Sequence, residues 1–144
     1  MIYLDTSFVV SLYLNDRHSP EARQRIVSAP PLWLTPLHNA EWAHAISQHV
    51  FRGELSLSES QRITAHLEEH VAHGRWMLVP IPEGAFELCA DLARRHGPKM
   101  AMGTLDTLHV ASALELKAVR FWTFDERQAK LAKAQGMKTL ERKL

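Results

Sequence analysis

Residues 104–125 read TLDTLHVASALELKAVRFWTFD, and this stretch indicates the fold class more clearly than any other part of the chain. The pattern predicts a helix that Thr104 caps and that runs over residues 105–118, followed by a strand over residues 121–124. One acidic residue, Asp106, interrupts the mostly apolar helix near its start, and another, Asp125, follows the strand directly. Acidic side chains in such apolar surroundings require a chemical explanation.

Short apolar runs alternate with helical patterns along the rest of the chain as well. We predict further strands over residues 2–4, 32–35, 76–81 and 137–140, and helices over residues 7–14, 20–28, 36–52, 56–74, 82–97 and 126–135. The alternation predicts an α/β fold with βαβ units and a mainly parallel sheet, into which residues 36–74 insert a long helical hairpin. No linker or low-complexity segment interrupts the pattern, so we expect one domain over residues 1–144.

Composition narrows the class of protein. A chain of 144 residues with 46% hydrophobic residues can bury a full core, and its longest apolar stretches are far shorter than a bilayer span. We therefore expect a cytoplasmic protein without a membrane partner. The single cysteine, Cys89, excludes an internal disulfide and a multi-cysteine zinc site, and it falls on the apolar stripe of a predicted helix. The net charge of +1 gives no global signature of nucleic-acid binding.

Four acidic residues are candidates for a shared site: Asp5, Glu41, Asp106 and Asp125. Asp5 and Asp125 each follow a predicted strand, and the carboxyl ends of parallel strands meet at the same edge of a sheet. If the first and fourth strands are neighbours, both side chains point into one crevice. Asp106, at the start of the preceding helix, can face the same crevice, whereas Glu41 must come from the third helix.

Each acid also has a purely structural explanation. Asp125 is a good helix cap, with Gln128 three residues later as in a capping box, and Asp106 in a first helical turn suits the helix dipole. Asp5 can cap the helix that follows it. Glu41 is harder to explain, because it lies in a helix interior beside Trp42, where an unpaired charge would be costly to bury. Asp106 lies in a helix that is apolar nearly all round, so we expect it to be deeply buried.

A divalent cation reconciles several carboxylates at one point. Close carboxylates repel one another unless a cation lies among them, and oxygen ligands without cysteine suit Mg²⁺ or Mn²⁺ better than zinc. Such ions lower the pKa of a bound water and offset charge on the attacking and leaving oxygens of a phosphodiester. The residues therefore predict hydrolysis of phosphodiester bonds.

Four segments carry a family resemblance: Leu4-Asp5-Thr6-Ser7, Asn39-Ala40-Glu41, the block from Thr104 to Leu114, and Thr123-Phe124-Asp125. They resemble the motifs of the PIN-domain ribonucleases, most of all the VapC toxins of bacterial toxin–antitoxin modules. The resemblance covers essentially the whole chain, and the block around Asp106 is its most specific part.

The resemblance implies a PIN-like three-layer α/β fold, with a mainly parallel five-stranded sheet flanked by helices. It also implies Mg²⁺- or Mn²⁺-dependent cleavage of RNA to a 5′-phosphate and a 3′-hydroxyl, and inhibition by a cognate antitoxin protein. By matching motifs, the four acids become the catalytic metal ligands. The supporting residues become Thr6 or Ser7, Thr123 and His109, the last of which we expect to steady a carboxylate or a helix contact.

Other functions fit less well. A phosphoryl-accepting receiver domain needs an aspartate after its third strand, where this chain has Val79-Pro80-Ile81-Pro82, and a haloacid-dehalogenase phosphatase needs a second aspartate at the position of Ser7. The remaining alternative is a catalytically inactive PIN-like module that binds RNA or serves as a scaffold. Such a module would typically lack at least one of the acids.

The helical hairpin of residues 36–74 suggests a protein partner. We expect its apolar face to form part of a homodimer or an antitoxin groove; this face comprises Leu55, Leu57, Ile63, Leu67 and Val71. The four tryptophans are expected in the core, with Trp42 the one candidate for stacking on an RNA base.

Overall fold

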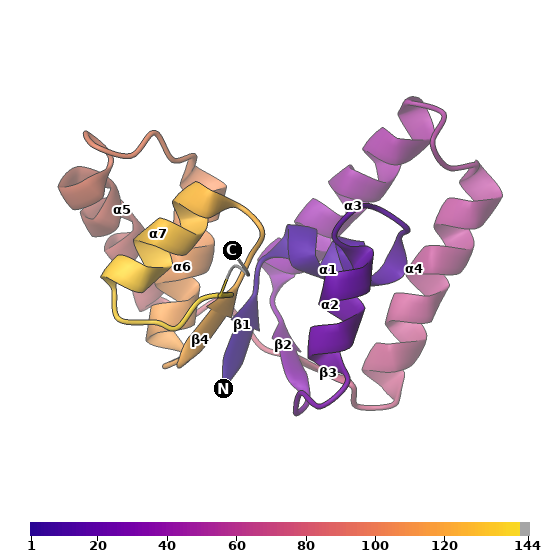
Figure 1. Ribbon diagram of the computed structural model, residues 1–144, viewed down its shortest axis with the longest axis horizontal. Coiled ribbons are helices and arrows are strands. Elements are labelled where there is room, and N and C mark those ends of the chain that lie inside the picture. The colour runs from indigo at the N-terminus through magenta and orange to yellow at the C-terminus, as the bar shows by residue number, and fades with distance from the viewer. Residues whose placement is uncertain (142–144) are drawn as a thin grey trace. The chain divides into compact units, whose positions relative to one another are not determined.

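The structure, a computed structural model, describes residues 1–141 and divides into two compact units (Figure 1). The first unit combines Met1–Asp5 with the chain from Ile81 onward, and the second is Thr6–Pro80. The expectation of a single domain over residues 1–144 stays a prediction. Within the described residues, no helix is long and apolar enough to cross a membrane.

The first unit is built on a pair of parallel strands, β1 (Ile2–Leu4) and β4 (Arg120–Trp122), with Leu4 opposite Trp122. The prediction that the first and fourth strands are neighbours is confirmed. Helix α5 (Gly84–His96) packs on α6 (Thr104–Glu115), and α7 (Glu126–Ala134) packs on both α6 and β4. The core gathers side chains that are almost inaccessible to solvent: Tyr3, Leu92, Val110, Phe121 and Leu131.

Helix α6 can be buried because the polar side chains along its buried stretch find hydrogen-bond partners, two of them at its own backbone. It is buried from Thr107 to Ala113; Thr107 donates to the carbonyl of Gly103, and Ser112 donates to that of Leu108. Gly103, in extended conformation, is the cap residue, and no side chain caps the helix. The prediction that Thr104 is the cap is therefore wrong, because the helix already includes Thr104.

The second unit carries a parallel pair of its own, β2 (Leu32–Leu34) and β3 (Trp76–Leu78). Helix α1 (Thr6–Tyr13) packs on α2 (Ser19–Ile26) and on α3 (Pro36–Phe51), and α4 (Leu57–Ala72) packs on α3 and β3. Helices α3 and α4 are the predicted hairpin, and each begins with a capping box. Gly53 and Gly74 follow their ends in the left-handed conformation, at φ +73° and +77°.

The expected five-stranded sheet is not confirmed among residues 1–141. The four described strands form two parallel pairs, and the predicted strand over residues 137–140 makes a single parallel bridge, between Arg120 and Lys138. Strand β1 has the predicted bounds, whereas β2, β3 and β4 end earlier than expected. Thr35 caps α3 instead of extending β2, and prolines at positions 80 and 82 follow β3.

The predictions about the tryptophan and cysteine side chains have clear outcomes. All four tryptophans are buried, as expected. Base stacking by Trp42 is wrong, because this side chain is 3% exposed, donates to Thr64 and contacts the ring of Tyr13 edge-on. Cys89 is the buried thiol expected from its helix stripe, and burial raises its pKa, which makes the thiol a poor nucleophile.

Candidate metal and catalytic site

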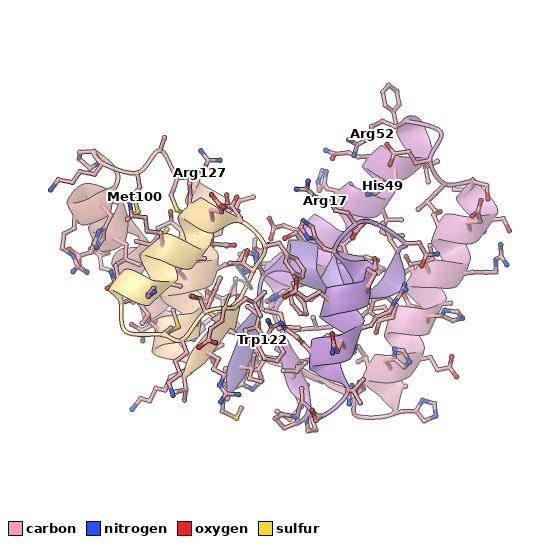
Figure 2. All side chains as sticks on the ribbon, viewed as in Figure 1. Arg17, His49, Arg52, Met100, Trp122 and Arg127 are labelled. Carbon is pink, nitrogen blue, oxygen red and sulfur yellow. The ribbon has the colours of Figure 1, made fainter. Side chains whose placement is uncertain are left out.

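Asp5 and Asp125 lie at the same edge of the β1–β4 pair. Asp5 directly follows β1, and its backbone N–H donates to the carbonyl of Trp122, the last residue of β4, at 3.0 Å. Asp125 stands between β4 and α7 in the sequence; Figure 2 labels Trp122, the last residue of β4, and Arg127, in the first turn of α7. Asp5 is only 6% exposed, whereas Asp125 is half-buried. The strand pairing thus places both aspartates at one edge, and the expectation that their side chains share a crevice stays a prediction.

Asp125 also performs the structural role that was its alternative explanation. Its Oδ1 accepts the backbone N–H groups of Arg127 at 2.9 Å and Gln128 at 3.0 Å, so it caps α7. The predicted capping box is wrong, however, because the Gln128 side chain does not return to the cap but points elsewhere in the unit. A carboxylate held by two N–H groups has a fixed orientation.

Asp106 lies in the first turn of α6 and is half-buried, not deeply buried as expected. The first turn of the helix reaches the surface, since the neighbouring Leu105 is itself 50% exposed. The Asp106 backbone carbonyl accepts a hydrogen bond from Gln128 at 3.2 Å. Arg127 donates to the carbonyl of Ala101 at 3.0 Å. Helix α7 is therefore bonded both to the segment before α6 and to the first turn of α6.

Gln128 is the residue that the sequence analysis missed. Its side-chain amide donates to Asp5 Oδ1 at 3.2 Å as well as to the Asp106 carbonyl, and its oxygen accepts from the hydroxyl of Thr123 at 2.7 Å. The Thr123 hydroxyl in turn accepts the backbone N–H of Asp125 at 3.1 Å. One buried amide therefore connects all three aspartate segments of the first unit. The signal in the sequence was a glutamine on the apolar face of α7, three residues before Leu131.

His109 has the structural role that was expected. It is fully buried, its Nδ1 lies 2.7 Å from the hydroxyl of Tyr3, and the two rings meet at an angle of 65°. Its Nε2 is 3.9 Å from Asp5 Oδ1, beyond hydrogen-bond distance. The pair joins α6 to β1, the strand that carries Asp5.

Glu41 belongs to the second unit. It lies in α3, half-buried, and its Oε1 accepts the hydroxyl proton of Thr6 at 2.8 Å. Thr6 is the first residue of α1 and follows Asp5 in the sequence, and Ser7 is exposed on the same helix. Thr6 therefore contacts one of the candidate acids, and its supporting role stays a prediction. The position of Glu41 relative to the three aspartates stays a prediction.

The donor set suits a hard divalent cation, because it consists of carboxylates from separate segments, with no thiolate. Between residues 1 and 141, no three acidic, histidine or cysteine side chains already stand close enough together to hold a metal ion. In donor chemistry alone these carboxylates suit Mg²⁺ or Mn²⁺, and binding of such an ion stays a prediction. Ions of this kind usually keep several of their waters, so few protein ligands are needed.

Comparison with known proteins identifies the class. The model of the PIN domain family matches residues 2–134, and the chain belongs to this family. Ribonuclease VapC46 of Mycobacterium tuberculosis is 28% identical over 138 residues, which cover 94% of this chain and 93% of that protein. The chain is thus similar to a VapC ribonuclease along nearly its whole length.

Two crystal structures share the fold. The sarcin-ricin loop cleaving toxin VapC20 of Mycobacterium tuberculosis superposes with a TM-score of 0.68 at 16% identity, over 95% of this chain and 96% of the toxin chain. FitAcB from Neisseria gonorrhoeae gives 0.70 at 17% identity, over 98% of this chain and 97% of that chain. The predicted PIN-like α/β fold is confirmed.

Proposed function

We propose that this chain is a Mg²⁺- or Mn²⁺-dependent endoribonuclease and the toxin of a toxin–antitoxin pair, acting in the cytoplasm. The observation that carries the proposal is the connection of Asp5, Asp106 and Asp125 through Gln128 in a PIN-family chain. The whole-length similarity to a VapC ribonuclease supports RNA as the substrate class.

The roles of the side chains follow from their chemistry. Asp5, Asp106 and Asp125 would hold the cation, with Glu41 as a fourth acid oriented by Thr6. When bound, Mg²⁺ or Mn²⁺ would supply a water of lowered pKa and offset charge on the phosphodiester oxygens. The acids would bind and orient the cation, and the amide of Gln128 donates a hydrogen bond to the Asp5 carboxylate.

The alternative function is a catalytically inactive PIN-like module that binds RNA or serves as a scaffold. Loss of one acid would be enough to remove metal-dependent hydrolysis while leaving the fold. All four acids are present in this sequence, so the enzyme is the better supported proposal.

We expect cleavage of a single-stranded RNA by the purified protein to stop in EDTA and to return when Mn²⁺ or Mg²⁺ is added in excess, because the cation would supply the activated water. The measurement is the initial rate on a fluorogenic RNA, and Ca²⁺ serves as a control cation. Undiminished cleavage in EDTA would remove the metal mechanism.

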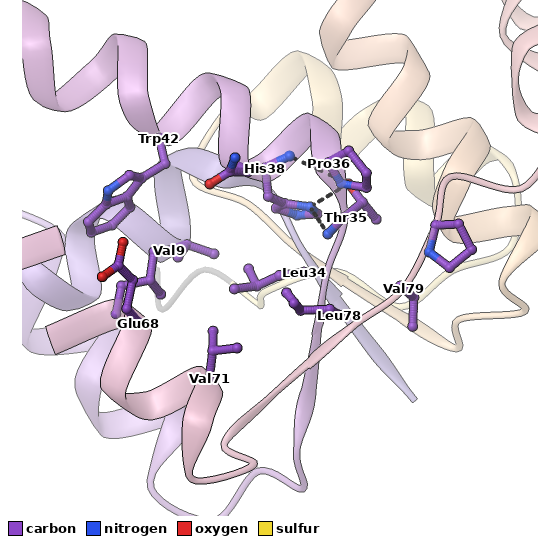
Figure 3. A pocket seen from close by; sticks show the side chains of 13 residues that line it. Val9, Leu34, Thr35, Pro36, His38, Trp42, Glu68, Val71, Leu78 and Val79 are labelled. Carbon is purple, nitrogen blue, oxygen red and sulfur yellow. Dashed lines mark hydrogen bonds between the residues drawn. The ribbon is translucent and has the colours of Figure 1, made fainter. Parts of the chain in front are cut away.

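The second unit contains an apolar cavity that supports an antitoxin partner. Its volume is about 560 Å³, and Figure 3 shows Val9, Leu34, Val71 and Leu78 directed into it. Leu67 lines it too, and Glu68 adds one acidic side chain. The predicted apolar face of the hairpin does not line one cavity: Leu67 and Val71 line this one, whereas Leu55 and Ile63 line a different, more polar cavity.

We propose that an apolar segment of the antitoxin fills the first cavity and carries a basic residue that pairs with Glu68.

Leu78→Glu should weaken binding of the cognate antitoxin by about tenfold or more, which is about 1.4 kcal/mol. Leu78 lines the cavity yet is 70% exposed, so the substitution places a charge in the proposed interface with little cost to folding. Leu57→Glu, at a residue that is 65% exposed and outside the cavity lining, is the matched control. Equal affinity of both variants for the antitoxin, measured by calorimetry, would mean that the cavity does not bind it.

We also propose that the protein is a homodimer. Light scattering of the same samples, which measures the molar mass in solution, tests this proposal.

A further inference from the structure

Gln128 is an unusual residue for its position. It is 1% exposed in the first turn of α7, on the same inner face as Leu131 and Ala132, which are buried and apolar. An apolar side chain of similar length would fill this position without any demand for hydrogen bonds. A buried amide is retained at low cost only when all its polar atoms are bonded.

We infer that Gln128 is a positioning residue, which holds the Asp5 carboxylate and the start of α6 in the arrangement that the proposed metal site requires. The inference rests on the proposed function. Gln128 itself is not a ligand in this assignment; it acts through Asp5 and through the backbone of Asp106.

The hydrogen-bond directions fix which side chain can serve here. The Asp106 carbonyl can only accept, and it lies on the same side of the amide as Asp5 Oδ1, so the NH₂ group of Gln128 faces these two oxygens. Gln128 Oε1 then faces Thr123, whose hydroxyl donates to it while the Thr123 oxygen accepts the backbone N–H of Asp125. Glutamate has the same length but would present an oxygen to both acceptors. Methionine would fill the space without any donor.

Positioning and plain core packing predict different effects of replacing Gln128. If Gln128 only fills space, replacing it changes stability and nothing else. If it positions Asp5, replacing it must also weaken the affinity for a cation in the absence of RNA, because the carboxylate is then free to turn away. Groups that orient metal ligands typically contribute about 10- to 100-fold in metal affinity or activity.

The experiment measures Mn²⁺ binding to the RNA-free protein by electron paramagnetic resonance, beside the melting temperature of the metal-free protein. Gln128→Met should raise the Mn²⁺ dissociation constant by about 10- to 100-fold, and Gln128→Glu should alter Mn²⁺ binding as well, because it places a further carboxylate against Asp5. Leu131→Met is the matched control on the same buried face, and its dissociation constant should stay within about twofold of wild type while its melting temperature falls.

Thr123→Val gives a second route if Gln128→Met fails to fold. Valine has the shape of threonine but lacks the hydroxyl that donates to the Gln128 amide, so the Mn²⁺ affinity of Thr123→Val should fall. Thr123→Ser keeps the hydroxyl and should bind Mn²⁺ as tightly as wild type. Wild-type affinity in the folded Gln128 or Thr123→Val proteins would overturn the inference while the proposed function stands. A wild-type protein that binds no Mn²⁺ would overturn both.

Discussion

Asp5→Asn is expected to reduce the rate of RNA cleavage in Mg²⁺ by about a thousandfold, while the protein stays folded. The size follows from the several kcal/mol of charge stabilisation that a bound cation supplies, at about 1.4 kcal/mol for each factor of ten. The fold should persist because asparagine keeps an oxygen that can accept the hydrogen bond from Gln128. Initial rates and melting curves of the same preparation measure the two effects.

Asp91→Asn is the matched control for this prediction. Asp91 lies on α5 in the same unit, and its carboxylate is exposed and paired with Arg95 at 3.0 Å, an i, i+4 contact of small energetic value. The same chemical change there should leave cleavage unaltered. If Asp5→Asn, purified beside it, cleaves RNA as fast as Asp91→Asn, the site assignment is mistaken.

Phe121→Ala is expected to lower the free energy of unfolding by about 3–5 kcal/mol, the usual cost of removing a phenylalanine from a packed core. Phe121 is fully buried in β4 and stacks on Tyr3 of β1, with ring centroids 5.5 Å apart. The contact joins the two strands whose ends carry Asp5 and Asp125. The loss should therefore appear in urea denaturation and, at temperatures where the variant is partly unfolded, in cleavage.

Phe86→Ala provides the comparison, because Phe86 is 60% exposed on α5 of the same unit. Its removal should change the free energy of unfolding by less than about 0.5 kcal/mol. Similar destabilisation by the two substitutions would mean that the β1–β4 packing described above does not hold the unit together.

The helices were predictable because local chemistry determines where they begin and end. Pro36 and the capping residues Thr35 and Ser56 define the starts of the hairpin helices, and Gly53 and Gly74 define their ends. The strand over residues 2–4 was predicted with its exact bounds, three others were predicted too long, and the one over residues 137–140 is only a bridge. The carboxyl ends of those three strands give way to turns, and no residue pattern distinguishes a last strand residue from the first turn residue when both are apolar.

The candidate site was predictable in part. Strand pairing brings Asp5 and Asp125 to one edge, which followed from the parallel arrangement alone. Gln128 was not found, because a glutamine three residues after Asp125 fits a capping box just as well as an inward-facing amide. Only the packing of α7 on α6 and β4 decides between the two directions. Glu41 became a candidate because an unpaired charge in a helix interior beside Trp42 would be costly to bury, and motif resemblance then assigned it to the metal site.

The chemistry of the cut ends tests the central claim most directly. RNA is incubated with wild-type protein in Mn²⁺ or in EDTA, and the ends of the fragments are determined by ligation and by phosphatase sensitivity. If water activated at the carboxylate site attacks the phosphodiester, the fragments carry a 5′-phosphate and a 3′-hydroxyl, and they form only with Mn²⁺. Fragments with a 5′-hydroxyl and a cyclic 2′,3′-phosphate, formed equally in EDTA, would contradict the account, because the nucleophile would then be the RNA's own 2′-hydroxyl.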